Sequence, residues 1–397
     1  MTNTLEKTIK TIKKIKKVII SPVLVHHLLK ENDERISGKG VIYVEDEIFS
    51  VFPSSWDIEG FEVIISKNRE VLYDVKDNLS LIIKNNDQNF VGEIFYRNKK
   101  ITEVTVYAKN IEQIWLRQDP ILRHEILKTK KVAVLGVGSV GSRVALELGR
   151  AGIGELILVD PDRLEIHNIV RHVASLKYLG RKKINAVEEI IHFFNPLTKI
   201  VKFDLTLDEN KIEEIRNIVN GCDLVVVALG PHEANIIVDQ ILYPLNIPAV
   251  YSGVFKRGYG GTIYTILPEI SGCYSCAHEA FVEKGILEFY MKKYGVPEFS
   301  LRDLSDQFID YGAPNILIAE PAINTDISII SNIQAKIALW ILSGKNITKM
   351  IGQIVLVILN TEKVDDKQSD LNLITTGHMS WSSRENCNHH QTIISIE

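Results

Sequence analysis

The fold is decided by one short segment, Lys131-Val-Ala-Val-Leu-Gly136-Val-Gly138-Ser-Val-Gly141. Its first half is a short apolar run rich in β-branched residues, which is typical of a buried strand. The three glycines then follow a G-x-G-x-x-G pattern, and residues 142–151 have helical character. Glycines permit a tight turn and a close backbone approach, while a helix start offers N–H groups and a positive dipole to a phosphate. The segment therefore predicts a strand–turn–helix unit that binds a nucleotide.

Further apolar strands and helical stretches alternate on the C-terminal side of this unit. This alternation predicts an α/β domain with a doubly wound, mostly parallel sheet over residues 116–393. We expect strands near 156–160, 222–229, 262–267 and 354–359, a helix near 327–342, and a polar connection over about 277–320.

Residues 1–115 form a separate, smaller module in this prediction. Short apolar runs lie between turn-like clusters at 41–43, 61–65, 79–83, 90–96 and 104–107. Their length and composition predict an α+β domain in which a small meandering sheet lies behind one or two helices. The module is interpreted as a recognition domain, and a simple packing extension is the alternative.

The composition excludes some classes of function. The formal net charge of -4 over 397 residues gives no general reason to expect nucleic-acid binding. No apolar run reaches about 18 residues, so no membrane span is expected. Four cysteines, two of them at C-x-x-C spacing, favour a reduced cytoplasm and a metal site over a disulfide scaffold.

The residues after the glycine turn distinguish the possible chemistries. Asp160 ends the next strand, where a carboxylate can bind ribose hydroxyls. Arg171 and Lys183 would place two cations beside bound phosphates, which suits attack on an α-phosphate with departure of pyrophosphate. The alternatives are that both are solvated surface cations, or that the chain is a nicotinamide-dependent dehydrogenase. The dehydrogenase hypothesis explains only the glycines and Asp160.

The complete pattern resembles the ThiF/MoeB/HesA family of ubiquitin-activating-enzyme-like adenylyltransferases. It consists of D-x-D at 160–162, N-x-x-R at 168–171, G-x-x-K at 180–183 and Asn-Pro at 195–196, all after the glycine turn. The resemblance implies that Asp160 holds the ribose of ATP, that Asn168 and Arg171 contact phosphates, and that Lys183 stabilises the α-phosphate. Asp162 belongs to the same nucleotide site.

The resemblance also implies an activity and a homodimer. The expected reaction is adenylation of the C-terminal carboxylate of a ubiquitin-like protein or a small precursor peptide, with Mg²⁺ accompanying ATP. Arg117-Gln118 resembles an upstream pair whose arginine reaches the partner subunit's ATP. The alternative is a catalytically weak or inactive peptide-binding scaffold that partners a peptide-modifying enzyme.

One position departs from the family pattern. The strand that begins at Asp223 is followed by Gly230, where the family has an aspartate that helps to bind magnesium. Loss of this carboxylate leaves Asp160, Asp162 or Glu233 as the candidate oxygen ligand, or leaves catalysis weak or absent.

A zinc site is predicted from two short ligand pairs far apart in the sequence. Cys273 and Cys276 form a C-x-x-C, and Cys387 with His390 forms a C-x-x-H, which together supply four tetrahedral ligands. His389 is the rival fourth ligand, and buried thiols without a metal are the alternative.

The fate of the activated carboxylate follows from the remaining cysteine. Cys222 precedes an apolar strand and is expected to be an inert buried thiol. We therefore expect no thioester within this chain, and a separate sulfur donor, amine or acceptor protein receives the acyl group. Lys256, Arg257 and Arg302 are candidate contacts for the substrate tail.

Overall fold

The computed structural model divides the chain into two compact units, Met1–Arg117 and Gln118–Glu397. In the first unit it describes residues 11–13, 15, 17–21, 24, 35–43, 46, 48–54, 61–66, 79–86, 89–96, 99–108 and 111–117. In the second it describes residues 118–230, 232–255, 258, 260–268, 270–282, 322–345, 354–359, 374–379 and 387.

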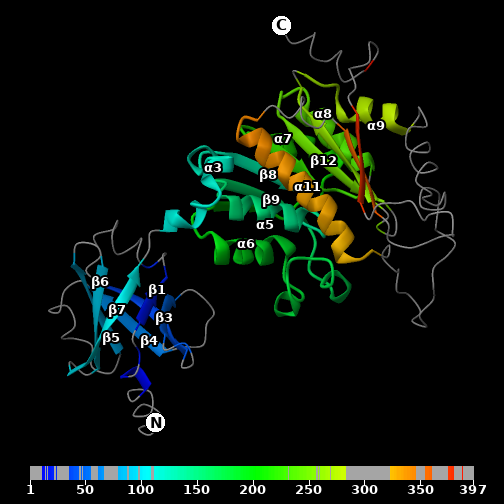
Figure 1. Ribbon diagram of the computed structural model, residues 1–397. Helices are drawn as coiled ribbons and strands as arrows, with labels where there is room; N and C mark the ends of the chain where they lie inside the picture. The colour runs from blue at the N-terminus through cyan, green and yellow to red at the C-terminus, as the bar shows by residue number, and fades with distance from the viewer. Residues whose placement is uncertain are drawn as a thin grey trace, which may run out of the picture. The chain divides into compact units, whose positions relative to one another are not determined.

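The described part of the first unit is a closed barrel of seven strands (Figure 1). In order around the barrel these are β1 (Lys17–Ile20), β3 (Ile48–Pro53), β2 (Arg35–Tyr43), β4 (Phe61–Ser66), β5 (Leu79–Asn86), β6 (Asn89–Tyr96) and β7 (Lys99–Ala108). The expected α+β module with a meandering sheet is corrected by this finding. The reason is the first strand, which pairs in parallel with both β3 and β7 and so joins the two edges of the sheet. Phe49, Val63 and Leu81 fill the interior and are fully buried.

The second unit is built on an eight-stranded sheet. Its strand order is β10 (Lys199–Phe203), β9 (Glu155–Val159), β8 (Lys131–Leu135), β11 (Leu224–Val227), β12 (Ala249–Val254), β13 (Gly260–Ile266), β14 (Ile354–Leu359) and β15 (Ile374–Met379). The pairs from β10 to β12 are parallel, and those from β12 to β15 are antiparallel.

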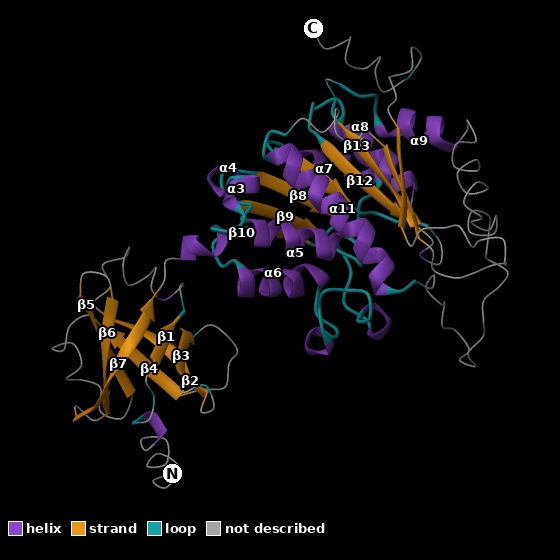
Figure 2. Ribbon diagram, in the orientation of Figure 1, coloured by secondary structure: helices purple, strands orange, loops and turns teal. Residues whose placement is uncertain are grey.

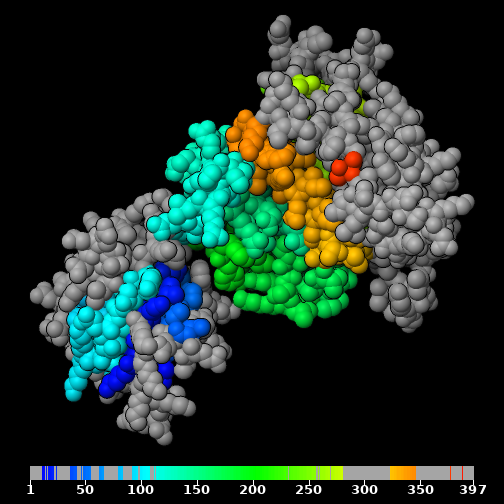
Figure 3. Space-filling model, in the orientation of Figure 1, coloured from blue at the N-terminus to red at the C-terminus, as the bar shows by residue number. Residues whose placement is uncertain are grey.

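Helices cover both faces of this sheet, which makes it doubly wound (Figure 2). One face packs on α5 (Gly141–Ala151), α6 (Lys183–Phe194) and α11 (Asn324–Leu342), and the other on α7 (Ile212–Val219), α8 (His232–Leu242) and α9 (Tyr274–Val282). Successive residues of β8 alternate between the two cores, with Val132 and Val134 on one side and Ala133 and Leu135 on the other. In the space-filling view, α11 (orange) lies at the surface of the second unit, beside green segments of the same unit (Figure 3).

Short helices precede and connect these elements. They are η2 (Ile111–Trp115), α3 (Asp119–Leu122), α4 (His124–Leu127), η3 (Ile166–Asn168), η4 (Leu176–Tyr178) and η5 (Glu209–Lys211). Each predicted strand and helix of the second unit overlaps an observed one, so the mostly parallel α/β prediction is confirmed. The polar connection expected from 277 begins instead as helix α9, and its part beyond 282 lies outside the described residues. Among the described helices, none is both long and apolar enough to cross a bilayer.

Candidate active site

The three glycines of the turn between β8 and α5 have different surroundings. Gly136 has a φ of 85°, and a β-carbon on it would lie 2.6 Å from the carbonyl oxygen of Ala228. A β-carbon on Gly141 would lie 1.8 Å from the carbonyl oxygen of Gly136. By contrast, a β-carbon on Gly138 would meet nothing within 4 Å. The fold of the turn therefore requires glycine at 136 and 141, whereas Gly138 leaves an open space beside the turn.

The start of helix α5 is suited to an anion. No side chain caps its first residues, and no acidic residue lies in its first turn. The helix has 11 residues, so its N-terminal N–H groups and dipole present positive charge to the open side of the turn.

Asp160 connects the glycine turn to the next segment of the chain. Its carboxylate is almost fully buried and accepts hydrogen bonds from the N–H groups of Val137, at 2.7 Å, and Asp162, at 2.9 Å. The carboxylate thus fixes the backbone of the turn. The ribose contact predicted for Asp160 stays a prediction, and it would use the lone pairs that these two bonds leave available.

Lys183, the first residue of α6, lies in the same cluster. Its ammonium nitrogen is 2.7 Å from Oδ2 of Asp162 and 3.8 Å from Oδ1 of Asp160. The lysine side chain is 10% exposed and that of Asp162 is 62% exposed. The structure therefore brings together the glycine turn, both aspartates and one of the two predicted cations.

Asn168 and Arg171 lie on a short segment that follows the aspartates. The side-chain oxygen of Asn168 accepts the N–H of Glu165, at 3.0 Å, in a capping box. The carbonyl of Asn168 accepts the N–H groups of Arg171 and His172, both at 2.9 Å. The amide nitrogen of Asn168 is the part of this side chain that could reach a phosphate, and the phosphate contacts of both residues stay predictions.

His172 joins this segment to the glycine turn. Its Nδ1 accepts the N–H of Ala174 at 3.0 Å, which leaves Nε2 to donate to the carbonyl of Val137 at 2.9 Å. Burial lowers the pKa of the ring to about 4, and the nearby Lys183 acts in the same direction. A neutral imidazole therefore holds the residue next to Arg171 against the turn. Sequence reasoning missed His172, and the only signal for it was its position beside Arg171.

Several predicted residues are not placed in this cluster. Arg117 is exposed and ends the first unit, so its predicted contact with a partner subunit stays a prediction. Glu233 is exposed in the first turn of α8. Lys256, Arg257 and Arg302 lie outside the described residues.

Gly230 has room for a side chain. A β-carbon on it would meet no atom within 4 Å. The missing aspartate is therefore not excluded by the packing around this position. Of the remaining candidates for a magnesium ligand, Asp162 is exposed and is linked to the glycine turn through Lys183 and Asp160.

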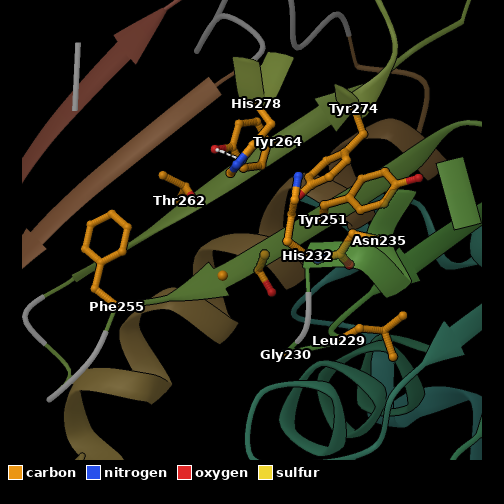
Figure 4. Close-up of a pocket in the computed structure, with 12 residues that line it drawn as sticks. Leu229, Gly230, His232, Asn235, Tyr251, Phe255, Thr262, Tyr264, Tyr274 and His278 are labelled. Atoms are coloured by element: carbon orange, nitrogen blue, oxygen red, sulfur yellow. Dashed lines mark hydrogen bonds between the residues drawn. The ribbon is translucent and has the colours of Figure 1, made fainter. Parts of the chain in front are cut away.

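Gly230 lies in the wall of a cavity of about 160 Å³ (Figure 4). Leu229 and Gly230 after β11, residues at the end of β12, Thr262 and Tyr264 on β13, and His232, Tyr274 and His278 from α8 and α9 line it. No Asp, Glu, Lys or Arg occurs among the described lining residues.

Histidine and tyrosine side chains pair along one wall of this cavity. Nδ1 of His232 lies 3.1 Å from the hydroxyl of Tyr274, and Nδ1 of His278 lies 3.4 Å from the hydroxyl of Tyr264. The two imidazole rings stack with centroids 4.0 Å apart. Burial, followed by the proximity of His232, lowers the pKa of His278 to about 4, and burial raises the pKa of Tyr274 to about 12. His278 and Tyr274 are therefore uncharged at neutral pH.

Three cysteines from distant parts of the chain form a cluster. The sulfur atoms of Cys273, Cys276 and Cys387 all lie within 4.8 Å of one another, and those of Cys273 and Cys387 are 3.6 Å apart. Thiolates bound to one zinc ion at about 2.3 Å would be about 3.8 Å apart, so the three thiols fit such an ion. His390 and its rival His389 lie outside the described residues.

Asp239 fixes the first half of this cluster. Its buried carboxylate accepts the N–H groups of Tyr274 and Ser275, at 2.9 and 3.3 Å, at the start of α9. The C-x-x-C pair is thereby held at the beginning of the helix that also carries Tyr274 and His278.

Cys222, the remaining cysteine, is buried as expected. Burial raises the pKa of its thiol to about 11. Because the thiolate is the nucleophile, this cysteine is unreactive near neutral pH.

The fold, and the cluster of Asp160, Asp162 and Lys183 beside the glycine turn, define a doubly wound α/β domain. Residues 107–372 match the ThiF family, which is most of the chain. The chain therefore belongs to the ThiF family.

Curated relatives include ubiquitin-like modifier-activating enzyme 5 of several animals. The protein from Aedes aegypti is 32% identical over 194 residues, which cover 47% of this chain and 49% of the relative. The one from Rattus norvegicus is 31% identical over 194 residues, 47% of this chain and 48% of the relative. The chain thus spans about half the length of the curated relatives it matches.

Solved structures of E. coli MccB share the fold. A structure with AMPCPP and MccA has a TM-score of 0.50 at 18% identity and covers 69% of this chain and 73% of that one. A second, with MccA-N7isoASN, has a TM-score of 0.51 at 17% identity and covers 70% of this chain and 74% of that one.

Proposed function

We propose that this chain uses ATP to adenylate the C-terminal carboxylate of a ubiquitin-like protein or a small precursor peptide. The observation that carries the proposal is the position of Lys183, held by Asp160 and Asp162 beside a glycine turn with an open space at Gly138. Arg171 follows on a segment that His172 ties to the same turn. A hydride transfer needs neither cation, whereas a phosphoryl group under attack does.

The reaction forms one bond and breaks one. An oxygen of the substrate carboxylate attacks the α-phosphorus of ATP. The bond between the α-phosphorus and the oxygen that bridges it to the β-phosphorus breaks, and pyrophosphate leaves. Lys183 and Arg171 stabilise the negative charge that grows on the phosphate oxygens and the leaving group. Magnesium would shield the phosphates, and the exposed carboxylate of Asp162 is the protein oxygen that we propose for it.

The names of the curated relatives and the ligands of the similar solved structures support this substrate class. The curated relatives activate ubiquitin-like modifiers, and one MccB structure holds AMPCPP together with MccA. In this proposal the acyl-adenylate passes directly to an acceptor protein or sulfur donor, because Cys222 is buried with a raised pKa.

A homodimer is the proposed assembly. Four apolar side chains between the aspartates and α6 are 49% to 74% exposed: Ile166, Val170, Leu176 and Leu179. Such a group of exposed apolar residues near the site suits a partner surface. In the proposed dimer Arg117 of one subunit reaches the ATP of the other.

We also propose one zinc ion per chain, held by Cys273, Cys276 and Cys387 with His390 or His389. Metal analysis of the purified protein should find one equivalent, and Cys387→Ser should lower both zinc content and melting temperature. Zinc-free protein whose melting temperature is unchanged by Cys387→Ser would remove this site.

A peptide-binding scaffold without chemistry is the second candidate, and Gly230 favours it. Pyrophosphate exchange into ATP separates the two, measured with and without peptides that copy the C-terminal tails of ubiquitin-like proteins or precursor peptides encoded nearby. Carboxylate-dependent exchange that is lost in Arg171→Ala supports the enzyme. ATP binding without exchange, unchanged in Arg171→Ala, supports the scaffold.

A further inference from the structure

The cavity beyond Gly230 shares a wall with the glycine turn. A β-carbon on Gly136 would lie 3.1 Å from Cδ2 of Leu229, and Leu229 lines the cavity. A substrate whose carboxylate reaches the α-phosphate at this turn therefore places its last residue next to the cavity.

The cavity has room for a side chain. Its volume of about 160 Å³ is close to that of an engineered cavity of about 150 Å³ that binds benzene. A terminal glycine has no side chain to occupy this space, so it would forgo the apolar contact that Leu229 and Phe255 offer.

The lining also selects against charge. The described lining contains no Asp, Glu, Lys or Arg, and its two imidazole rings stack against each other. A buried carboxylate or ammonium without an opposite charge is strongly disfavoured. The hydroxyls of Tyr274 and Tyr264 pair with Nδ1 of His232 and His278, and no other described residue is hydrogen-bonded to Nε2 of either ring. Those nitrogens can donate to or accept from a polar group.

We propose that this cavity receives the uncharged side chain of the residue whose carboxylate is activated, so that the chain selects substrates that do not end in glycine. The inference rests on the proposed adenylation, because only a carboxylate bound for the α-phosphate brings that residue to this place. It assigns Leu229, Phe255, His232 and His278 to substrate selection.

The test uses a series of N-acetylated tripeptides, Ala-Ala-X, that differ only in the last residue. Gln against Glu changes charge at constant shape, and Gln against Gly removes the side chain. In pyrophosphate exchange, we expect kcat/KM for the Gln and Phe peptides to exceed that for Gly and Glu at least about 10-fold. Equal values, or a preference for Gly or Glu, would overturn the inference.

Two variants change different properties of the cavity, one its size and the other its charge. Gly253→Val narrows it, and the β-carbon meets only Oγ1 of Thr262, at the ordinary distance of 3.6 Å. This variant should reduce the preference for Gln and Phe over Gly. Phe255→Lys adds a cation and should shift preference from Gln towards Glu. Phe193→Lys, on α6 across the sheet, is the matched control and should change neither ratio.

Direct binding distinguishes failure of the cavity from failure of the chemistry. The same peptides are titrated by calorimetry with a non-hydrolysable ATP analogue present. Binding that depends on X without any exchange keeps the cavity assignment and contradicts adenylation. Exchange without dependence on X keeps adenylation and contradicts the cavity assignment, and no dependence on X in either measurement also contradicts it.

Discussion

The two halves of the candidate site differ in how they treat charge. At the glycine turn between β8 and α5, buried Asp160 and Lys183 lie within 3.8 Å of each other, and backbone N–H groups complete the network. At the cavity beside β11 and β12, the described lining contains no Asp, Glu, Lys or Arg. The sheet edge thus carries a charged cluster beside the glycine turn and a cavity whose described lining contains no Asp, Glu, Lys or Arg. Removing a charge should therefore be severe in the first half, and adding one severe in the second.

The largest expected effect is the loss of the cation beside the turn. Lys183→Ala should lower kcat for pyrophosphate exchange by about 100- to 1000-fold, because the charge of the transition state loses a preorganised partner. Lys182→Ala is the matched control, since the ammonium of this neighbouring residue contacts Pro161 and Asp204 instead. Similar rates for the two variants would remove Lys183 from the reaction.

His172 should act through Arg171. His172→Ala frees the segment from the carbonyl of Val137 and should lower kcat by about 10- to 100-fold with little change in the KM for ATP. In an Arg171→Ala background the same change should cost little further rate, because the group that it positions is already absent. Additive losses in this double-mutant cycle would mean that His172 acts independently of Arg171. His192→Ala, whose ring contacts the carbonyl of Thr198, is the control.

The glycines should separate folding from binding. Gly141→Ala places a β-carbon 1.8 Å from a carbonyl oxygen and should destabilise the protein by about 1–3 kcal/mol. Gly138→Ala meets no atom and should leave the melting temperature unchanged, yet weaken ATP binding by about 10-fold because the methyl group enters the phosphate approach. Thermal unfolding and ATP titration measure both, and a destabilised Gly138→Ala would show that this glycine is also structural.

Acid should weaken the protein through two imidazoles, His172 and His278, whose pKa values are lowered by burial. His172 and His278 have pKa values of about 4 when folded, below about 6.5 for an unfolded histidine. As the pH falls from 7 to 5, the unfolded chain binds protons first, so the free energy of unfolding decreases by on the order of 1–2 kcal/mol per ring. Urea unfolding at both pH values should show this decrease, and His278→Phe should make it smaller. An unchanged pH dependence in that variant would place the titration elsewhere.

The smallest expected effect comes from restoring a carboxylate after β11. Gly230→Asp has room for its side chain and should raise the exchange rate by about 2- to 5-fold at low magnesium concentration. A rise from no activity to measurable exchange would instead support the scaffold as the natural state.

The sequence predicted the α/β domain well because its signals are local. Continuous apolar runs marked β8, β9 and β11, and the glycine pattern marked the turn before α5. The barrel was missed because it depends on a pairing between distant strands, β1 with β7, and no local pattern encodes that closure. The prediction that Lys183 lies near the glycine turn followed from its motif, whereas His172 required knowledge of a contact 35 residues away. The cavity likewise depends on three strands and two helices meeting at one place.

Helix α9 gives the sulfur cluster an influence beyond anchoring the chain. Cys276 lies on α9 with Tyr274 and His278, and Cys273 directly precedes the helix, so this segment carries two of the three thiols and part of the cavity wall. A metal held by these sulfurs would set the tilt of that helix and thereby the shape offered to a substrate. Oxidants or chelators would then broaden which carboxylates are accepted at concentrations too low to unfold the protein.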